Sequence, residues 1–255
     1  MNPCPHRTNM NNESPTQRTA PQGNPRRDVP AHPNARWAAA FQFSPVKMLI
    51  ALILYICSAP LVDQIPHGPI ISSLLMTAVL ITATLAMGSR RWTLAVAVFL
   101  VIPALAARWA AHLRPDLIPP EVFSTIGILF VGFVAANILL FILRAPEVGA
   151  DVLCAGISGY LLLGLLWAFA YTLVWKLSPD AFAFEPRPGA SHAMQGFTAT
   201  YFSYITLCSV GYGDIVPVSP MARMLAMMEA MTGTFYVAVM IARLVALHSS
   251  RKDHG

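Results

Sequence analysis

The stretch that decides the fold is Ser209-Val210-Gly211-Tyr212-Gly213-Asp214, which lies between two long apolar segments. Its glycines alternate with larger residues, and glycine is the residue that enters left-handed backbone conformations without a steric clash at Cβ. Alternation of this kind lets successive carbonyl oxygens face one axis, as they do where backbone carbonyls replace the water shell of a dehydrated cation. The stretch therefore predicts a cation-coordinating strand, in which Ser209 adds a hydroxyl at one end and Val210 and Tyr212 pack outward.

The composition predicts a membrane protein. Hydrophobic residues make up 56% of the chain and charged residues only 11%, whereas about 25% of a soluble domain is charged. Six apolar stretches each approach or exceed the roughly 17–25 residues that span hydrocarbon. We expect these spans at residues 46–62, 69–88, 92–113, 122–143, 152–177 and 220–247. The predicted fold is an all-α membrane protein: four N-terminal transmembrane helices, then a helix, a re-entrant pore loop and a final helix.

A shorter apolar segment, residues 196–208, precedes the glycine-containing strand. With about thirteen residues it is too short to span, so we expect a re-entrant pore helix that stops inside the membrane. Its C-terminal end would carry the negative pole of the helix dipole, about half an elementary charge. Such an end stabilises a hydrated cation below it.

The stretch Thr206-Leu207-Cys208-Ser209-Val210-Gly211-Tyr212-Gly213-Asp214 resembles the signature Thr-x-x-Thr-Val-Gly-Tyr-Gly-Asp of the tetrameric potassium channels. The resemblance covers roughly residues 150–248. Ser209 replaces a threonine but keeps its hydroxyl, while Cys208 replaces a second common threonine and is expected to remove a hydrogen-bonding group behind the filter. The resemblance implies a selectivity filter over residues 209–213, with K⁺ held at Ser209, Val210, Gly211 and Tyr212 and no other cofactor.

The resemblance also implies residues that support the filter. The family pairs the acid after the filter with an aromatic donor on the pore helix, which here means Asp214 and Tyr201. Glu229 is the only acid within the last span, and we expect it to be either protonated or bonded to a hydroxyl such as that of Thr206 or Tyr204. It is either a structural brace of the filter or a charge that concentrates cations in the cavity.

Gly233 lies about thirteen residues into the last span, hence about 20 Å along its axis. This distance matches the hinge glycine of the channel family, although the glycine has a second explanation, which is close packing. The resemblance then places Thr234, Val237, Ile241 and Val245 along the inner pore. In the fifth span, Gly156, Gly159 and Gly164 are explained either by close helix packing or by ordinary membrane-helix composition.

Three regions are expected. Residues 1–40 are expected to form a disordered basic cytoplasmic tail, residues 41–145 a four-helix transmembrane region, and residues 149–250 the pore module.

With both termini inside, twelve of the seventeen Lys and Arg residues are cytoplasmic, as the positive-inside rule requires. The fourth span has no Lys or Arg before Arg144, which excludes a voltage sensor with an arginine row, and Arg108 in the third span is expected to snorkel to the outer interface.

The sequence thus predicts a potassium-selective channel that is not voltage-sensing, with passive conduction through a homotetrameric pore in the plasma membrane, specifically a bacterial inner membrane. A less selective cation channel and a non-conducting accessory subunit remain as alternatives. No catalytic or nucleotide-binding pattern is present, so no enzyme is expected. The expected partners are membrane lipid, K⁺ and further copies of the chain, without nucleic acid.

Overall fold

The structure is a computed structural model that describes residues 45–62, 65–86, 91–113, 120–145, 149–186 and 192–252. The chain divides into Met1–His32 and Pro33–Gly255, and every described residue belongs to the second unit. The tail predicted over residues 1–40 lies outside the described residues.

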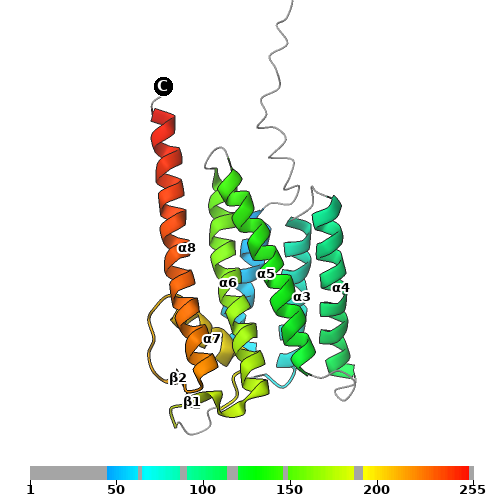
Figure 1. The fold of residues 1–255 in the computed structure, drawn as a ribbon. Helices are drawn as coiled ribbons and strands as arrows, with labels where there is room; N and C mark the ends of the chain where they lie inside the picture. Colours follow the sequence, from blue (N-terminus) through cyan, green and yellow to red (C-terminus); the bar gives the residue numbers. More distant parts are fainter. Residues whose placement is uncertain are drawn as a thin grey trace, which may run out of the picture. The chain divides into compact units, whose positions relative to one another are not determined.

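Six long helices make up most of the described part of the molecule (Figure 1). They are α2 (Pro45–Val62), α3 (Gly68–Ala86), α4 (Arg91–Leu113), α5 (Pro120–Arg144), α6 (Ala150–Leu177) and α8 (Pro220–Lys252). The short helix α7 (Phe197–Leu207) lies between α6 and α8 in the sequence and occupies one end of the arrangement. The all-α fold, with four helices before a helix, short helix and helix module, is the one predicted.

Five of these helices contain segments long and apolar enough to cross a membrane, namely Pro45–Val62, Trp92–Ala110, Ser124–Arg144, Ala150–Leu177 and Pro220–Val245. The apolar part of α3, Ile70–Leu85, is shorter. The span expected over residues 69–88 corresponds to α3, and its last two positions, 87 and 88, lie outside the described residues.

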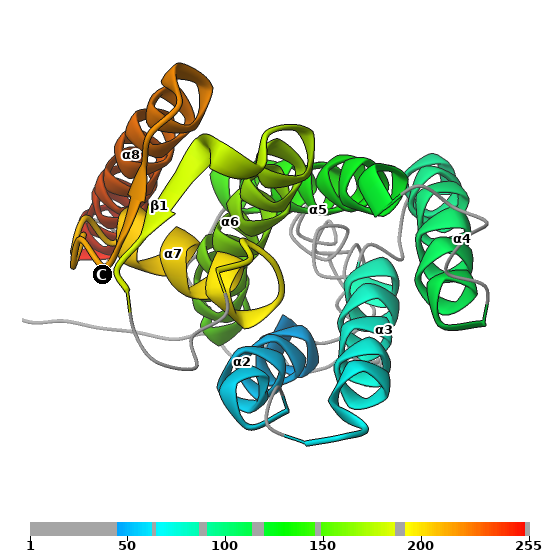
Figure 2. The ribbon, with the colours of Figure 1, turned by 90° about the horizontal axis from the view of Figure 1, so that it is seen from below.

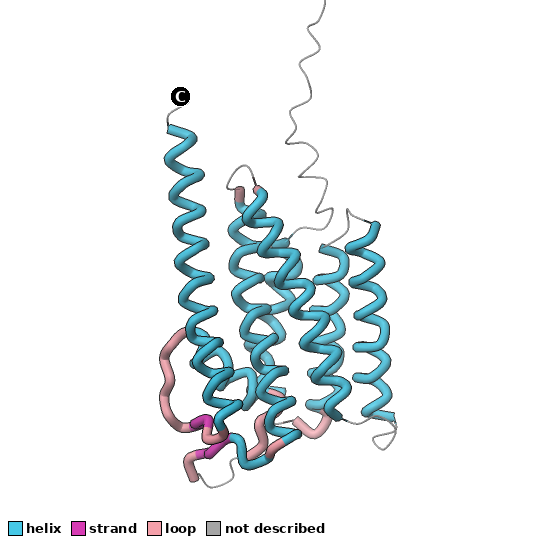
Figure 3. Tube along the Cα trace, viewed as in Figure 1, coloured by secondary structure: helices cyan, strands magenta, loops and turns pink. Residues whose placement is uncertain are grey.

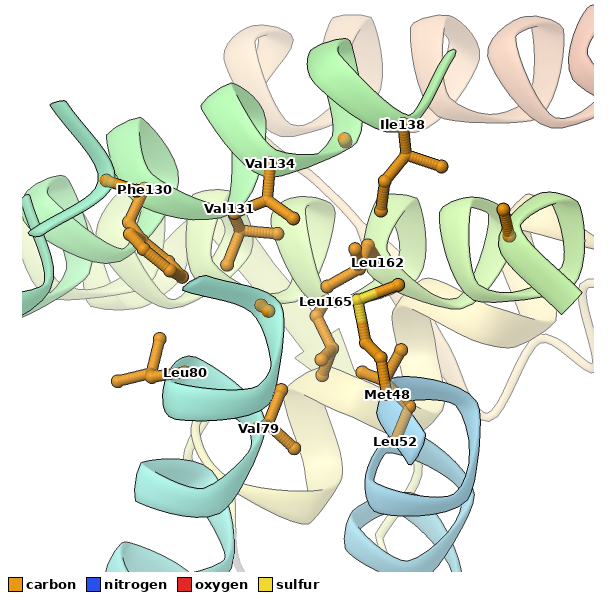
Figure 4. Packing of buried hydrophobic residues seen from close by; sticks show 14 of the residues in the cluster. Met48, Leu52, Val79, Leu80, Phe130, Val131, Val134, Ile138, Leu162 and Leu165 are labelled. Carbon is orange, nitrogen blue, oxygen red and sulfur yellow. The ribbon is translucent and has the colours of Figure 1, made fainter. Parts of the chain in front are cut away.

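Helix α6 is the centre of the packing. It contacts α2 and α5 as well as α7 and α8, and the view along the helices shows it between α5 and α7 (Figure 2). A hydrophobic core joins α6 to α2, α3 and α5 (Figure 4). Its labelled members are Met48, Leu52, Val79, Leu80, Phe130, Val131, Val134, Ile138, Leu162 and Leu165. Helices α2 and α5 thus pack directly against α6, while α3 packs against α2 and α4 against α5.

Arg108 of α4 is hydrogen-bonded to α3. Its Nε donates to Ser73 Oγ at 3.0 Å and its Nη2 to Ser72 Oγ at 2.9 Å, both on α3. The half-buried guanidinium is therefore bonded to two adjacent serines of α3, whose hydroxyl oxygens accept its hydrogens. The expectation that Arg108 snorkels to the outer interface stays a prediction.

The segment between α6 and α7 contains one strand of a small ribbon that the sequence pattern does not predict. A 3₁₀ turn, η1 (Pro179–Ala181), leads into β1 (Phe182–Phe184), which pairs antiparallel with β2 (Ile215–Pro217) directly after the predicted filter. Phe182 of β1 packs edge-on against Tyr171 of α6 and Phe202 of α7, with ring centroids 5.7 and 5.6 Å apart. This aromatic cluster fixes α7 against α6.

Candidate functional site

The predicted filter follows α7 as a loop (Figure 3). Gly211 and Gly213 have φ angles of 55° and 85°, in the left-handed region predicted for them. A Cβ added at either glycine would meet nothing within 4 Å in this chain, so the constraint is the backbone conformation and not contact. The alternation that the sequence predicted is therefore present in the backbone.

Ser209 also has a positive φ, 56°, which its residue type does not predict. The reason lies in the end of α7. The N–H of Ser209 donates to the Thr206 carbonyl at 2.9 Å and that of Val210 to the Ile205 carbonyl at 2.8 Å, the two bonds of a Schellman motif. That motif needs a left-handed residue at the position of Ser209, where glycine is usual. The filter strand thus begins as the C-terminal cap of the pore helix.

The end of the strand that leads into β2 is held through Asp214. Tyr201 Oη donates to Asp214 Oδ2 at 2.9 Å, so the predicted contact is present. The N–H of Ile215 donates to Asp214 Oδ1 at 3.1 Å, and the Asp214 carbonyl accepts from the N–H of Glu185 at 2.8 Å. The acid therefore joins the strand both to α7 and to the end of β1. An open depression lined by Glu185, Tyr201, Tyr212, Gly213 and Asp214 borders this end.

The end of α7, where the strand begins, contacts α6 through Tyr160. Its hydroxyl donates to the Leu207 carbonyl at 3.3 Å and lies 3.5 Å from Cys208 Sγ. The expectation that Cys208 removes a hydrogen-bonding group is therefore wrong, because the thiol stands within sulfur hydrogen-bonding distance of a phenol. No feature of the sequence pointed to Tyr160, since its partner lies 48 residues away.

Glu229 is fully buried, at 0% exposure, between α6, α7 and α8. Its carboxyl oxygens contact Tyr171 Oη and Ser203 Oγ, each at 2.5 Å. A hydroxyl partner was predicted, but the named candidates are wrong. Thr206 Oγ1 donates to the Phe202 carbonyl at 2.8 Å within its own helix, as threonine hydroxyls in helices commonly do. Tyr204 Oη donates to the Leu161 carbonyl at 2.6 Å.

Glycines on α6 lie against side chains of α7 and α8. A Cβ at Gly164 would stand 2.3 Å from the Tyr204 ring, and one at Gly159 would stand 2.4 Å from Tyr236 Oη. Tyr236 Oη donates to the Gly156 carbonyl at 2.7 Å. Of the two explanations for these glycines, the contacts favour close packing.

Gly233 lies within the continuous helix α8, which runs from Pro220 to Lys252. A Cβ there would stand 2.2 Å from the Leu207 carbonyl oxygen, so α8 approaches the end of the pore helix closely at this point. The side chains predicted to line the inner pore, Thr234, Val237, Ile241 and Val245, are all exposed in the single chain.

Comparisons with known proteins agree with this site. A family model described as Ion channel matches residues 159–249, which include α7, the strand and most of α8. The chain is 28% identical over 95 residues to two pore potassium channel c of Oryza sativa subsp. japonica, an alignment that covers 35% of this chain and 21% of that protein. It is 33% identical over 97 residues to inward rectifier potassium channel Kirbac3.1 of Paramagnetospirillum magnetotacticum, covering 38% and 29% respectively.

The alignment with a third relative covers almost the whole length of that protein. Protein LctB of Bacillus caldotenax is 30% identical over 125 residues, which are 46% of this chain and 92% of that protein. The chain spans less than a third of the length of the two named potassium channels. No solved structure matches the chain significantly. With the glycine-containing strand, the short helix before it and these similarities together, the chain belongs to the pore-loop ion channel family.

Proposed function

We propose that the chain assembles as a homotetramer whose central pore conducts K⁺ selectively and passively. The observation that carries this proposal is the alternating left-handed backbone at Ser209, Gly211 and Gly213 within a Ser-Val-Gly-Tyr-Gly strand. Such alternation is what directs consecutive carbonyl oxygens to one side, where they replace the hydration shell of K⁺. The ligands are the backbone oxygens of residues 209–212 and the Ser209 hydroxyl.

Exposed apolar side chains support the assembly. Val210 and Tyr212 are 52% and 72% exposed in the single chain, although the strand needs them packed outward. Apolar side chains of α8, among them Met224, Met228 and Phe235, are also exposed. One chain supplies one strand, and cyclic symmetry with four copies closes a carbonyl ring and covers these surfaces together.

The proposed arrangement in the membrane follows from charge. Residues 149–250 form the pore module and residues 41–145 a scaffold, with both termini cytoplasmic in a plasma membrane, which we take to be a bacterial inner membrane. Helix α5 carries Arg144 only at its end, so it lacks the row of charges that moves in a voltage sensor. The proposal assigns the chain to passive transport rather than to catalysis.

Reversal potentials test the proposal. Purified full-length protein in planar bilayers, under opposed K⁺ and Na⁺ gradients, should give a reversal potential close to the K⁺ equilibrium potential. Equal permeability to the two ions would reject K⁺ selectivity and favour the less selective cation channel. Mass photometry of the detergent-solubilised protein should show four copies per particle, and a stable monomer or dimer would reject the assembly.

A further inference from the structure

The carboxyl group of Glu229 belongs to a buried polar chain that connects three helices. Glu229 comes from α8, Tyr171 from α6 and Ser203 from α7, and each of the three side chains is 0% exposed. The Tyr171 hydroxyl lies 2.5 Å from Glu229 Oε2, and Ser203 Oγ lies 2.5 Å from Glu229 Oε1. The protonation state of the carboxyl therefore has to agree with the hydrogens that these partners can supply.

Ser203 decides this state, because its Oγ also lies 2.7 Å from the Gly164 carbonyl oxygen. A carbonyl oxygen only accepts hydrogen bonds, and a serine hydroxyl has a single hydrogen to donate. If Ser203 donated to Glu229, the serine and carbonyl oxygens would face each other at 2.7 Å with no hydrogen between them. Both contacts are satisfied only when Ser203 donates to Gly164 and accepts a hydrogen bond from Glu229.

We propose that Glu229 is held as a neutral carboxylic acid, with its proton on Oε1 donated to Ser203. The Tyr171 hydroxyl then donates to Oε2. The chain of donors runs in one direction, from Tyr171 through Glu229 and Ser203 to the Gly164 carbonyl, so it begins and ends on α6.

The surroundings fit a neutral group. An ionised carboxylate away from water is costly without a cation, and no Lys, Arg or His of the described residues is bonded to Glu229. The other titratable side chains nearby, Tyr160 and Tyr204, direct their hydroxyls to the carbonyls of Leu207 and Leu161. They therefore supply no hydrogen that would compensate a charge at Glu229.

The proton makes Glu229 a positioning residue, a role that rests on the function proposed above. Ser203 lies on the pore helix, whose last turn caps into the filter strand at Ser209. Loss of the proton would leave one serine hydrogen for two acceptors, so Ser203 would lose its bond either to Gly164 of α6 or to Glu229 of α8. The neutral acid keeps both, and thereby fixes the helix from which the filter starts.

Infrared spectroscopy tests the proton directly. The full-length protein in lipid, at a pH well above the usual carboxyl pKa of about 4, should show the carbonyl stretch of a protonated carboxyl group. This band should shift in protein labelled with ¹³C-glutamate, vanish in Glu229→Gln and persist in Glu185→Gln, a control at an exposed acid. Absence of the band in the unmodified protein, or its survival in Glu229→Gln, would overturn the inference.

Potassium flux from liposomes tests the positioning role. In Glu229→Gln the amide N–H₂ can donate to Ser203 while the amide oxygen accepts from Tyr171, so flux should stay within about twofold of the unmodified protein. Glu229→Leu removes both bonds and should lower sustained flux by about tenfold or more. Equal losses in both variants, reversed by added salt, would show a cavity charge and reject the role.

The two measurements also separate this inference from the proposed function. A protein that shows the carboxylic acid band but conducts no K⁺ supports the inference while rejecting the function. A protein that conducts K⁺ without the band does the reverse.

Discussion

Alanine at position 233 should loosen the contact between α8 and the end of the pore helix. The added Cβ would stand 2.2 Å from the Leu207 carbonyl oxygen and 3.0 Å from Leu207 Cδ1. To restore an ordinary contact of 3.4 Å from 2.2 Å, the two atoms must separate by 1.2 Å. The obstructing atom belongs to the backbone, and it also accepts a hydrogen bond from Tyr160, so it cannot rotate away.

The change in stability caused by Gly233→Ala is the sum of two opposed effects. Replacing glycine by alanine within a helix stabilises it by about 1 kcal/mol, and overpacking a tight contact costs about 1–3 kcal/mol. Because a backbone oxygen cannot yield, we take the upper end, which leaves a net destabilisation of about 2 kcal/mol. Gly132→Ala in α5 is the matched control, since its Cβ would meet only Leu166 Cδ1 at 3.6 Å. That variant should be stabilised by up to about 1 kcal/mol.

Thermal unfolding in detergent micelles checks both variants side by side. Gly233→Ala should unfold at a lower temperature than the unmodified protein, and Gly132→Ala at the same or a higher temperature. The packing explanation would be refuted if the two variants were equally stable and Gly233→Ala altered only the open probability. That outcome would favour a hinge at this glycine.

Three further predictions concern conduction. Gly211→Ala should abolish K⁺ flux because its φ of 55° is strained for any residue with a Cβ, and retained selective flux would contradict the role of this backbone. Open probability should change little between about −100 and +100 mV in bilayer recordings, since Arg144 is the only basic residue of α5. Steep activation would mean that charges on another helix move with voltage. Tyr201→Phe removes the 2.9 Å bond to Asp214, a charge-assisted bond worth about 1.5–3 kcal/mol, and should shorten the time for which single channels stay conducting. Unchanged open durations in that variant would show that the bond does not brace the filter.

Helix positions were predictable because each depends on local information. An apolar run of sufficient length specifies a span, and proline or glycine beside it specifies the ends. Ser219 and Pro220 illustrate this at α8, where Ser219 Oγ accepts from the N–H of Ala222 at 3.2 Å and proline occupies the first helical position. The ribbon of β1 and β2 was not predictable, because strands of three residues carry no periodic pattern.

The filter was predictable only in part. The residue type predicts the left-handed conformations of Gly211 and Gly213, but not that of Ser209. The signal for Ser209 was its place two residues after the last residue of α7, where a Schellman motif needs a left-handed residue. The partners of Glu229 were out of reach for another reason. A sequence gives the depth and angle of a side chain on its own helix, but not which residue of a neighbouring helix stands opposite.

The same limit applies to the four N-terminal helices, which the sequence presents only as a transmembrane region. In the structure α2 and α5 pack against α6, while Tyr204 of the pore helix fits over Gly164 on the same helix. A Cβ at Gly164 would stand 2.3 Å from the Tyr204 ring, so this contact has no spare room. Close-packed interiors transmit displacement instead of absorbing it. A movement of α2 or α5 that shifts α6 must therefore also shift the pore helix, because the ring of Tyr204 packs directly on Gly164 with no free space between them.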